Sequence, residues 1–165
     1  MVQITGAGFD RLEIAELRKK GIIVCNMPGG SNYAVAEYCY TGAILMLRQL
    51  LNFHGIETGQ YDQVRLKMIE TKMRSLTELT VGIIGYGNIG RATADLFRKS
   101  RCKILVFDPL LKNSDLEVEL GTRQTDLSEL LRESDIVSIH TPISENTVNM
   151  INTAEISMMK TNSIL

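Results

Sequence analysis

Apolar runs alternate with helix-like segments along the second half of the chain. The runs L-T-V-G-I-I-G, K-I-L-V-F-D and D-I-V-S-I-H are short and rich in β-branched residues, as strands are. Residues 88–100 carry apolar positions at helical spacing, and D-L-S-E at 126 and N-T-A-E at 152 are capping boxes that open two further helices. Strands and helices in alternation predict an α/β fold, a parallel sheet with helices on both faces. S-I-L at 163–165 begins one more strand.

The first half of the chain contains a shorter strand–helix–strand pattern. A strand at 2–4 precedes a turn of three small residues, and a helix then runs from a cap at Asp10 to Lys20, with Gly21 as its stop. The run at 22–25 is apolar enough for a strand buried on both faces. A helix at 32–51 is apolar nearly all round, so we expect it to be buried between layers. Residues 53–77 predict a partly helical connecting arm.

Composition is that of an ordinary soluble protein, with 44% hydrophobic and 22% charged residues among 165. The net charge of −1 includes no basic block, which argues against a nucleic-acid partner. The most apolar run, 38–47, is shorter than the roughly 20 residues that cross a bilayer. The N-terminus lacks the pattern of a signal peptide. We therefore expect a cytoplasmic protein without a membrane or nucleic-acid partner.

Three cysteines, Cys25, Cys39 and Cys102, lie far apart in apolar runs. Their odd number and spacing predict buried free thiols in a reducing compartment, where they fill the core. No spacing of cysteine or histidine suggests a metal site.

The glycine-rich stretch V-G-I-I-G-Y-G-N-I-G follows a predicted strand and opens a predicted helix. In a nucleotide-binding turn, Gly85 permits the tight bend, Gly87 lets a pyrophosphate approach the backbone, and Gly90 lets the helix pack against the strand. The N–H groups of Asn88 and Ile89 would then point at the phosphates from the positive end of the helix. The spacing alone is weak evidence, and its position between strand and helix strengthens it.

Asp108 supplies the second half of this pattern. It closes the next strand, about 20 residues after the last glycine, where a carboxylate accepts hydrogen bonds from the ribose hydroxyls. The same charge repels a 2′-phosphate, which favours NAD(H) over NADP(H). An aspartate before Pro109 is also a common turn former. Methyltransferases use a glycine-rich first turn with an acidic second strand as well, but with looser glycine spacing.

Several stretches in order resemble the D-isomer-specific 2-hydroxyacid dehydrogenases, the family of phosphoglycerate, D-lactate and hydroxypyruvate/glyoxylate dehydrogenases. They are G-A-G-F-D, V-C-N-M-P-G, A-V-A-E, the glycine turn, V-F-D-P, S-D-I-V-S-I-H-T-P, E-N-T-V-N-M-I-N and M-M-K-T-N-S-I-L. The resemblance is weakest between Phe53 and Leu76. It implies the end of a substrate domain at 1–31, an interdomain helix and arm at 32–76, and the first part of a Rossmann-like NAD-binding domain at 77–165.

The resemblance also assigns site residues. It implies that the cofactor NAD(H) meets the glycine turn, the ribose acid, the segment after the fourth strand and a threonine beyond it, and that a loop backbone meets the carboxylate of a 2-hydroxy or 2-keto acid. Each residue could instead have only a structural role. The cofactor residues are Gly85, Tyr86, Gly87, Asn88, Ile89, Gly90, Asp108, His140, Thr141, Pro142 and Thr147, and the substrate residues are Gly6, Ala7 and Gly8.

The resemblance implies hydride transfer in a longer, homodimeric protein, with the interdomain helix and arm at the dimer interface. It places the catalytic arginine, glutamate and histidine after Leu165, so we expect this chain alone to be inactive, and His140 is not the catalytic histidine. A non-enzymatic NAD(H)-sensing module of the corepressor type and a degenerate product that does not fold are the alternatives. Homocysteine-forming hydrolases and alanine dehydrogenases have similar glycine turns without G-A-G-F-D and A-V-A-E.

Overall fold

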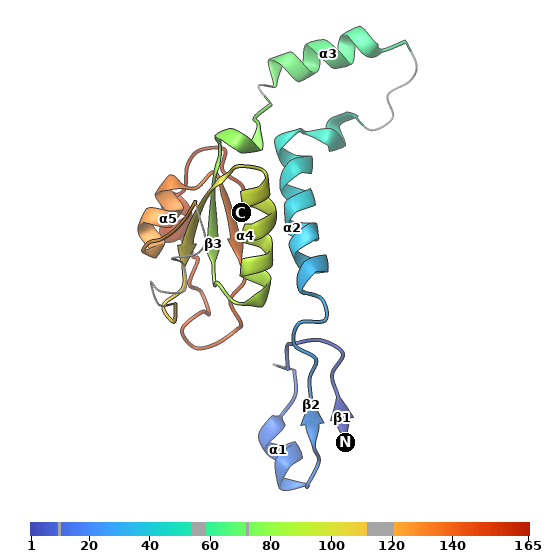
Figure 1. Cartoon of the computed structure of the whole chain (residues 1–165), viewed down its shortest axis with the longest axis vertical. Coiled ribbons are helices and arrows are strands. Elements are labelled where there is room, and N and C mark those ends of the chain that lie inside the picture. Colours follow the sequence, from blue (N-terminus) through green and yellow to red (C-terminus); the bar gives the residue numbers. More distant parts are fainter. Residues whose placement is uncertain (10, 54–58, 72, 112–120) are drawn as a thin grey trace.

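The computed structural model describes residues 1–9, 11–53, 59–71, 73–111 and 121–165. Figure 1 shows a small β–α–β unit at one end of a long helix, α2, with a layered α/β body beside that helix. In chain order the elements are β1 Val2–Gln3, α1 Ile14–Lys19, β2 Val24–Cys25, α2 Asn32–Leu47, the 3₁₀ turn η1 Leu50–Phe53, α3 Tyr61–Glu70, the 3₁₀ turn η2 Leu76–Glu78, β3 Thr80–Ile84, α4 Asn88–Lys99, β4 Lys103–Phe107, β5 Thr122–Gln124, α5 Leu127–Glu133, β6 Ile136–Ile139 and α6 Thr153–Met158.

The main sheet has the order β5-β4-β3-β6, and all of its strands are parallel. Val81 at the centre pairs with Ile104 on one side and Ile136 on the other. Ile164 adds a parallel bridge to Ile136, where we expected the S-I-L strand to begin. These pairings confirm the predicted α/β fold. Because every strand runs the same way, the loops after β3, β4 and β6 meet at one edge.

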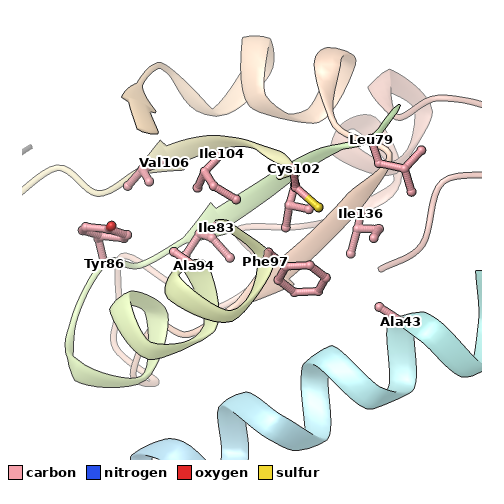
Figure 2. Close-up of a cluster of buried hydrophobic side chains, with 11 residues drawn as sticks. Ala43, Leu79, Ile83, Tyr86, Ala94, Phe97, Cys102, Ile104, Val106 and Ile136 are labelled. Carbon is pink, nitrogen blue, oxygen red and sulfur yellow. The ribbon is translucent and has the colours of Figure 1, made fainter. Parts of the chain in front are cut away.

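Alternate strand residues supply two hydrophobic cores, one on each face of the sheet. Ile83, Ile104 and Ile136 face α4, where they pack with Phe97 and with Ala43 of α2 (Figure 2). Their chain neighbours Ile84, Leu105 and Val137 lie on the opposite face of the sheet. There they form a second cluster with Leu130 and Leu131 of α5, and Met158 of α6 packs against it. Helices therefore cover both faces, as the alternation of strands and helices predicts.

The predicted helix ends are formed largely as expected. The side chain of Asp126 accepts a hydrogen bond from the N–H of Glu129 at 2.8 Å, and Asn152 and Glu155 form a complete capping box. Gly21, with φ of +67°, follows α1 as its stop. The proposed cap at Asp10 lies outside the described residues, and α1 begins later than predicted, at Ile14.

Burial at the N-terminal end and in α2 differs from our expectation. In α2 only Ala36 and Ala43 are buried, while Tyr38 keeps 81% of its surface exposed. The predicted burial between layers is therefore wrong within the described residues, because α2 packs on α4 along one face only. Burial of β2 on both faces is also wrong, since β2 pairs with β1 alone in a two-stranded sheet.

The cysteines are only partly buried. Cys25 is exposed and Cys39 is half-buried, so the predicted burial is wrong for Cys25 and incomplete for Cys39. Cys102 is buried, its Sγ lies 3.1 Å from the carbonyl oxygen of Leu76, and burial raises the pKa of its thiol to about 11. It therefore fills the core as a protonated thiol.

A buried carboxylate joins three segments at the end of the sheet opposite the glycine turn. Asp135, whose side chain is 6% exposed, accepts hydrogen bonds from Arg74 Nη2 at 2.7 Å and from the backbone N–H of Thr80 at 2.9 Å. Lys160 Nζ lies 3.2 Å away. Burial alone would raise the pKa of Asp135, but the hydrogen bonds from Thr80, Arg74 and Lys160 outweigh it and lower the pKa below 3.8.

We expect Asp135→Asn to lower the free energy of unfolding by about 2 kcal/mol, because it leaves two cations without their shared carboxylate. The unfolded state binds the proton more readily, so this stabilisation is present above pH 3.8 and is lost as the pH falls through the lower folded pKa. Urea unfolding at several pH values measures both effects. Asp95→Asn is the matched control, since Asp95 pairs with Arg98 and Lys99 on the surface. Equal losses in the two variants would contradict the role of Asp135.

Candidate functional site

The loops after β3, β4 and β6 enclose a cleft of about 450 Å³ at the carboxyl edge of the main sheet. In open parallel sheets, ligands bind at this edge. Much of the cleft wall is apolar, and one carboxylate and a few hydroxyl and amide groups interrupt it. Its lining residues are Gly85, Gly87, Phe107, Asp108, Pro109, Leu110, Leu127, His140, Thr141, Pro142, Ser144, Asn146, Thr147 and Met150.

The three glycines of the turn differ in whether a side chain would fit at their positions. Gly85 has φ of +87°, and a Cβ there would lie 2.9 Å from the backbone carbon of His140. A Cβ on Gly90 would lie 2.1 Å from the carbonyl oxygen of Gly85, so α4 packs against the end of β3 only because this residue has no side chain. A Cβ on Gly87 would meet nothing within 4 Å, because this residue faces the open cleft.

The N-terminus of α4 leaves backbone donors beside the cleft. The first N–H to bond a carbonyl within the helix is that of Arg91, which donates to Gly87 at 2.9 Å. The N–H groups of Asn88 and Ile89 come before it, and a helix offers such groups no carbonyl of its own. Gly87, the N-cap residue, provides no side-chain cap. Together with the positive end of the helix dipole, these donors suit a phosphate group.

Asp108 lies across the turn from these donors, and two backbone groups hold its carboxylate. Oδ2 accepts the N–H of Tyr86 at 2.8 Å, and Oδ1 accepts the N–H of Leu110 at 2.9 Å. A carboxylate oxygen has about two acceptor positions, so each oxygen of Asp108 keeps one for a ligand. The carboxylate can thus accept hydrogen bonds from two neighbouring hydroxyls.

His140 and Thr147 shape the third loop of the cleft. The backbone N–H of His140 donates to the carbonyl oxygen of Ile84 at 2.7 Å. The ring Nε2 of His140 lies 2.9 Å from Ser138 Oγ. Burial lowers the pKa of His140 below 6.5, so its ring is neutral at pH 7. The hydroxyl of Thr147 donates to the carbonyl oxygen of Pro142 at 2.6 Å and accepts a hydrogen bond from the backbone N–H of Ser144 at 2.8 Å. It therefore braces this loop from within.

The structure brings most of the predicted cofactor residues together. Those that line the cleft are Gly85, Gly87, Asp108, His140, Thr141, Pro142 and Thr147. Asn88, Ile89 and Gly90 form the first turn of α4 beside it. Tyr86 contributes its backbone N–H to Asp108, while its side chain is buried under the guanidinium of Arg91, 4.6 Å above the ring centroid.

The predicted substrate residues lie in a different part of the chain. Gly6, Ala7 and Gly8 form the loop after β1, and none of them lines the cleft. The N–H of Met27 bonds the carbonyl of Gly6 at 3.0 Å, and Asn26 Nδ2 bonds the carbonyl of Ala7 at 2.9 Å. In Figure 1 this loop belongs to the unit that lies at the same end of the molecule as the start of α4.

Sequence reasoning missed several residues that line the cleft, namely Phe107, Pro109, Leu110, Leu127, Ser144, Asn146 and Met150. Phe107, Pro109 and Leu110 flank Asp108 in the chain, so the position of that acid at a strand end was an available signal. Their apolar surfaces beside a carboxylate suit a flat ring joined to a hydroxylated sugar. Met150 reaches the cleft through the irregular segment before α6, which no periodicity could predict.

Elsewhere in the described residues we find a second, largely apolar hollow and no group of metal ligands. A hollow of about 550 Å³ beside α1 and β2 is lined mainly by apolar residues, among them Ile4, Ile14 and Ile22. Histidine, cysteine and acidic side chains form no group that could hold a metal ion in the part of the chain that the structure describes. Across the same residues, each helix is too short or too polar to span a bilayer.

Comparison with known protein families gives one match that covers most of the chain. Residues 43–165 match the family described as D-isomer specific 2-hydroxyacid dehydrogenase, NAD binding domain. Among curated proteins, a D-2-hydroxyacid dehydrogenase (NAD(+)) of Clostridioides difficile is 36% identical over 155 residues, which are 93% of this chain and 45% of that protein. A hydroxypyruvate reductase of Thermotoga maritima is 34% identical over 97% of this chain and 50% of its own length.

Solved structures give a similar match. A D-lactate dehydrogenase from Aquifex aeolicus, complexed with NAD and lactic acid, aligns with a TM-score of 0.76 and 33% identity. The alignment covers 97% of this chain and 47% of that one. The chain thus spans about half the length of the relatives that it matches.

Proposed function

Because the chain belongs to the D-isomer-specific 2-hydroxyacid dehydrogenase family and carries its NAD-binding domain, we propose that the gene product transfers hydride between NAD(H) and a 2-hydroxy or 2-keto acid. The observation that carries the proposal is the pairing of two elements at one sheet edge. Gly87 leaves the helix N-terminus open to a ligand, and the Asp108 carboxylate is held with two free acceptor positions opposite it.

The residues of the cleft bind and orient the dinucleotide in this proposal, and the nicotinamide ring supplies or accepts the hydride. The N–H groups of Asn88 and Ile89 donate to the pyrophosphate, which passes over Gly87. Asp108 accepts hydrogen bonds from the hydroxyls of the adenosine ribose and repels a 2′-phosphate. Thr141 and Pro142 lie against the adenosine, and the brace from Thr147 keeps their loop in place.

The remaining parts of the site follow the domain division that we expected from the sequence. We assign residues 1–31 to the end of a substrate domain, 32–76 to an interdomain helix and arm, and 77–165 to the cofactor domain. The backbone at Gly6, Ala7 and Gly8 then meets the carboxylate of the substrate. The proposal takes the catalytic arginine, glutamate and histidine from parts of the gene product outside residues 1–165.

The test is NADH oxidation by the full-length gene product with glyoxylate, hydroxypyruvate and pyruvate as separate substrates. We expect NADH to be consumed with at least one of these 2-keto acids, and consumption to depend on the acid. Tight NADH binding without turnover of any of them would contradict the dehydrogenase and support an NAD(H)-sensing module. Such a module uses the same cleft, so binding alone does not separate the two functions.

We also propose that a second copy of the chain covers the exposed faces of α2 and α3. Tyr33 and Tyr38 of α2 are 72% and 81% exposed, and Leu66 and Ile69 of α3 are 61% and 64% exposed. Large apolar side chains that stand exposed on two helices leave apolar surface that an interface would cover. A homodimer through α2 and α3 would remove this surface from water.

We expect the full-length gene product to be a dimer in light scattering after size exclusion, and Tyr38→Glu to shift it to the monomer. A glutamate there places a charge in an apolar interface. The control is Ile156→Glu on α6, where the native side chain is also exposed, at 54%. A monomeric native protein, or a Tyr38→Glu dimer as stable as the control, would contradict the proposal.

A further inference from the structure

The edge strand β5, which we did not predict, places one side chain behind the Asp108 loop. Nε2 of Gln124 lies 3.3 Å from the carbonyl oxygen of Asp108 and 3.3 Å from that of Leu111. Both partners are carbonyls, which only accept, so the amide nitrogen is the group that faces them. Gln124 is absent from the residues that line the cleft.

The strand that carries Gln124 is itself tied to β4. Gln124 pairs with Val106 in the parallel register, and the N–H of Thr125 donates to the carbonyl of Val106 at 2.9 Å. The backbone of Gln124 is therefore fixed to the strand that ends at the Asp108 loop. Its side chain spans from this fixed point to both ends of the turn at 108–111.

That turn determines where the Asp108 carboxylate lies. The N–H of Leu111 donates to the carbonyl of Asp108 at 3.2 Å and closes the turn. Leu110, inside the turn, donates its N–H to Asp108 Oδ1 at 2.9 Å. Leu110 keeps 89% of its surface exposed, whereas Leu111 packs against the core on the α4 face of the sheet, so packing holds only one end of the turn. The amide of Gln124 bonds the carbonyls at both ends of the turn, which limits how far they can move.

We propose that Gln124 is a positioning residue for the choice of cofactor: through the carbonyls of Asp108 and Leu111 it holds the Asp108 carboxylate where it accepts the ribose hydroxyls of NAD(H) and excludes a 2′-phosphate. This inference rests on the proposed NAD(H) function. It predicts that a change at Gln124, which does not line the cleft, alters the preference between NADH and NADPH.

The test compares NADH and NADPH binding to the full-length gene product and its Gln124→Met variant by fluorescence titration. Methionine keeps the length of the side chain and removes both N–H donors. We expect the NADH Kd to rise about threefold to tenfold, because binding must then order a turn that one or two hydrogen bonds no longer hold, and the NADPH Kd to rise less or to fall. With a substrate in hand, KM for NADH rises while kcat at saturation stays unchanged.

Two controls separate positioning from a general loss of structure. Arg123→Met changes the neighbouring residue of β5, which pairs with Glu129 and Glu133, and leaves the ratio of the two Kd values unchanged. Gln124→Met in an Asp108→Asn background has no further effect on the ratio, because the carboxylate that it positions is gone. Gln124→Leu gives a second, uncharged variant that lacks the donors.

Each outcome bears on the proposal. A lower NADH:NADPH preference in Gln124→Met and Gln124→Leu that disappears in the Asp108→Asn background supports it. Equal weakening of both cofactors, an unchanged ratio, or the same change of ratio in the Asp108→Asn background overturns it. Failure of the native protein to bind NADH at all would instead refute the proposed function, and this inference with it.

Discussion

Replacing Gly90 with alanine is expected to destabilise the protein by about 3 kcal/mol or more, because the new methyl group has no space. Its Cβ would lie 2.1 Å from the carbonyl oxygen and 3.1 Å from the carbonyl carbon of Gly85, which are backbone atoms at the end of β3. Relief requires α4 to move away from the sheet. That movement would separate Phe97 and Ala94 from the core that they fill on this face.

Helix propensity acts in the opposite direction, so the sign of the stability change distinguishes the two effects. Alanine favours a helix over glycine by about 1 kcal/mol, so propensity alone predicts that Gly90→Ala is stabilised. Urea unfolding of the two proteins measures the balance. The matched control is Gly87→Ala, whose Cβ meets nothing within 4 Å and whose φ of −76° suits any residue. A Gly90→Ala protein as stable as Gly87→Ala would contradict the close packing of α4 on β3.

Replacing Asp108 with alanine is expected to reduce the preference for NADH over NADPH about 100-fold, since two hydrogen bonds to a charged group are lost. Part of the change is weaker NADH binding without the acceptor for the ribose hydroxyls. The rest is stronger NADPH binding, because the charge that repels a 2′-phosphate is gone. Steady-state kinetics or fluorescence titration of the full-length gene product with both cofactors measures the ratio.

Asp108→Asn separates the charge of this residue from its hydrogen bonds. The amide oxygen can still accept one of the two N–H groups that hold the carboxylate, from Tyr86 or Leu110, while the repulsion of a phosphate disappears. We therefore expect a smaller loss of NADH affinity than in Asp108→Ala. An unchanged ratio of cofactors in both variants would refute the ribose role of Asp108 and leave it as a turn former.

The parts of the fold that could be predicted are those in which a residue's own chemistry decides its structure. The glycine turn was predictable because Gly85 adopts a positive φ and Gly90 tolerates no Cβ, and both constraints are local. Asp126 and Asn152 were predictable as caps for the same reason, since each bonds the backbone two or three residues ahead. Apolar runs sufficed for β3 and β4, which lie at the centre of the sheet.

The parts that could not be predicted depend on distant partners. The strand β5 reads T-R-Q, with no apolar run, and is a strand only because it pairs with β4 at the edge of the sheet. The apolar surface of α2 indicated that something must cover it, but not that the described residues would cover only one face. The resemblance pointed to Thr147 as a cofactor contact, whereas the bonds that its hydroxyl makes to Pro142 and Ser144 appear only in three dimensions.

The most direct test of the central claim, that dinucleotide binds at the glycine turn, is NADH titration of the full-length gene product and its Gly87→Ala variant. Native stability should be preserved in Gly87→Ala, because the added methyl group points into the open cleft. We predict saturable binding by the native protein and a rise in Kd of about tenfold or more in the variant, since the methyl group stands where the pyrophosphate passes. The same NADH affinity in both proteins, or no saturable binding by the native one, would contradict the account.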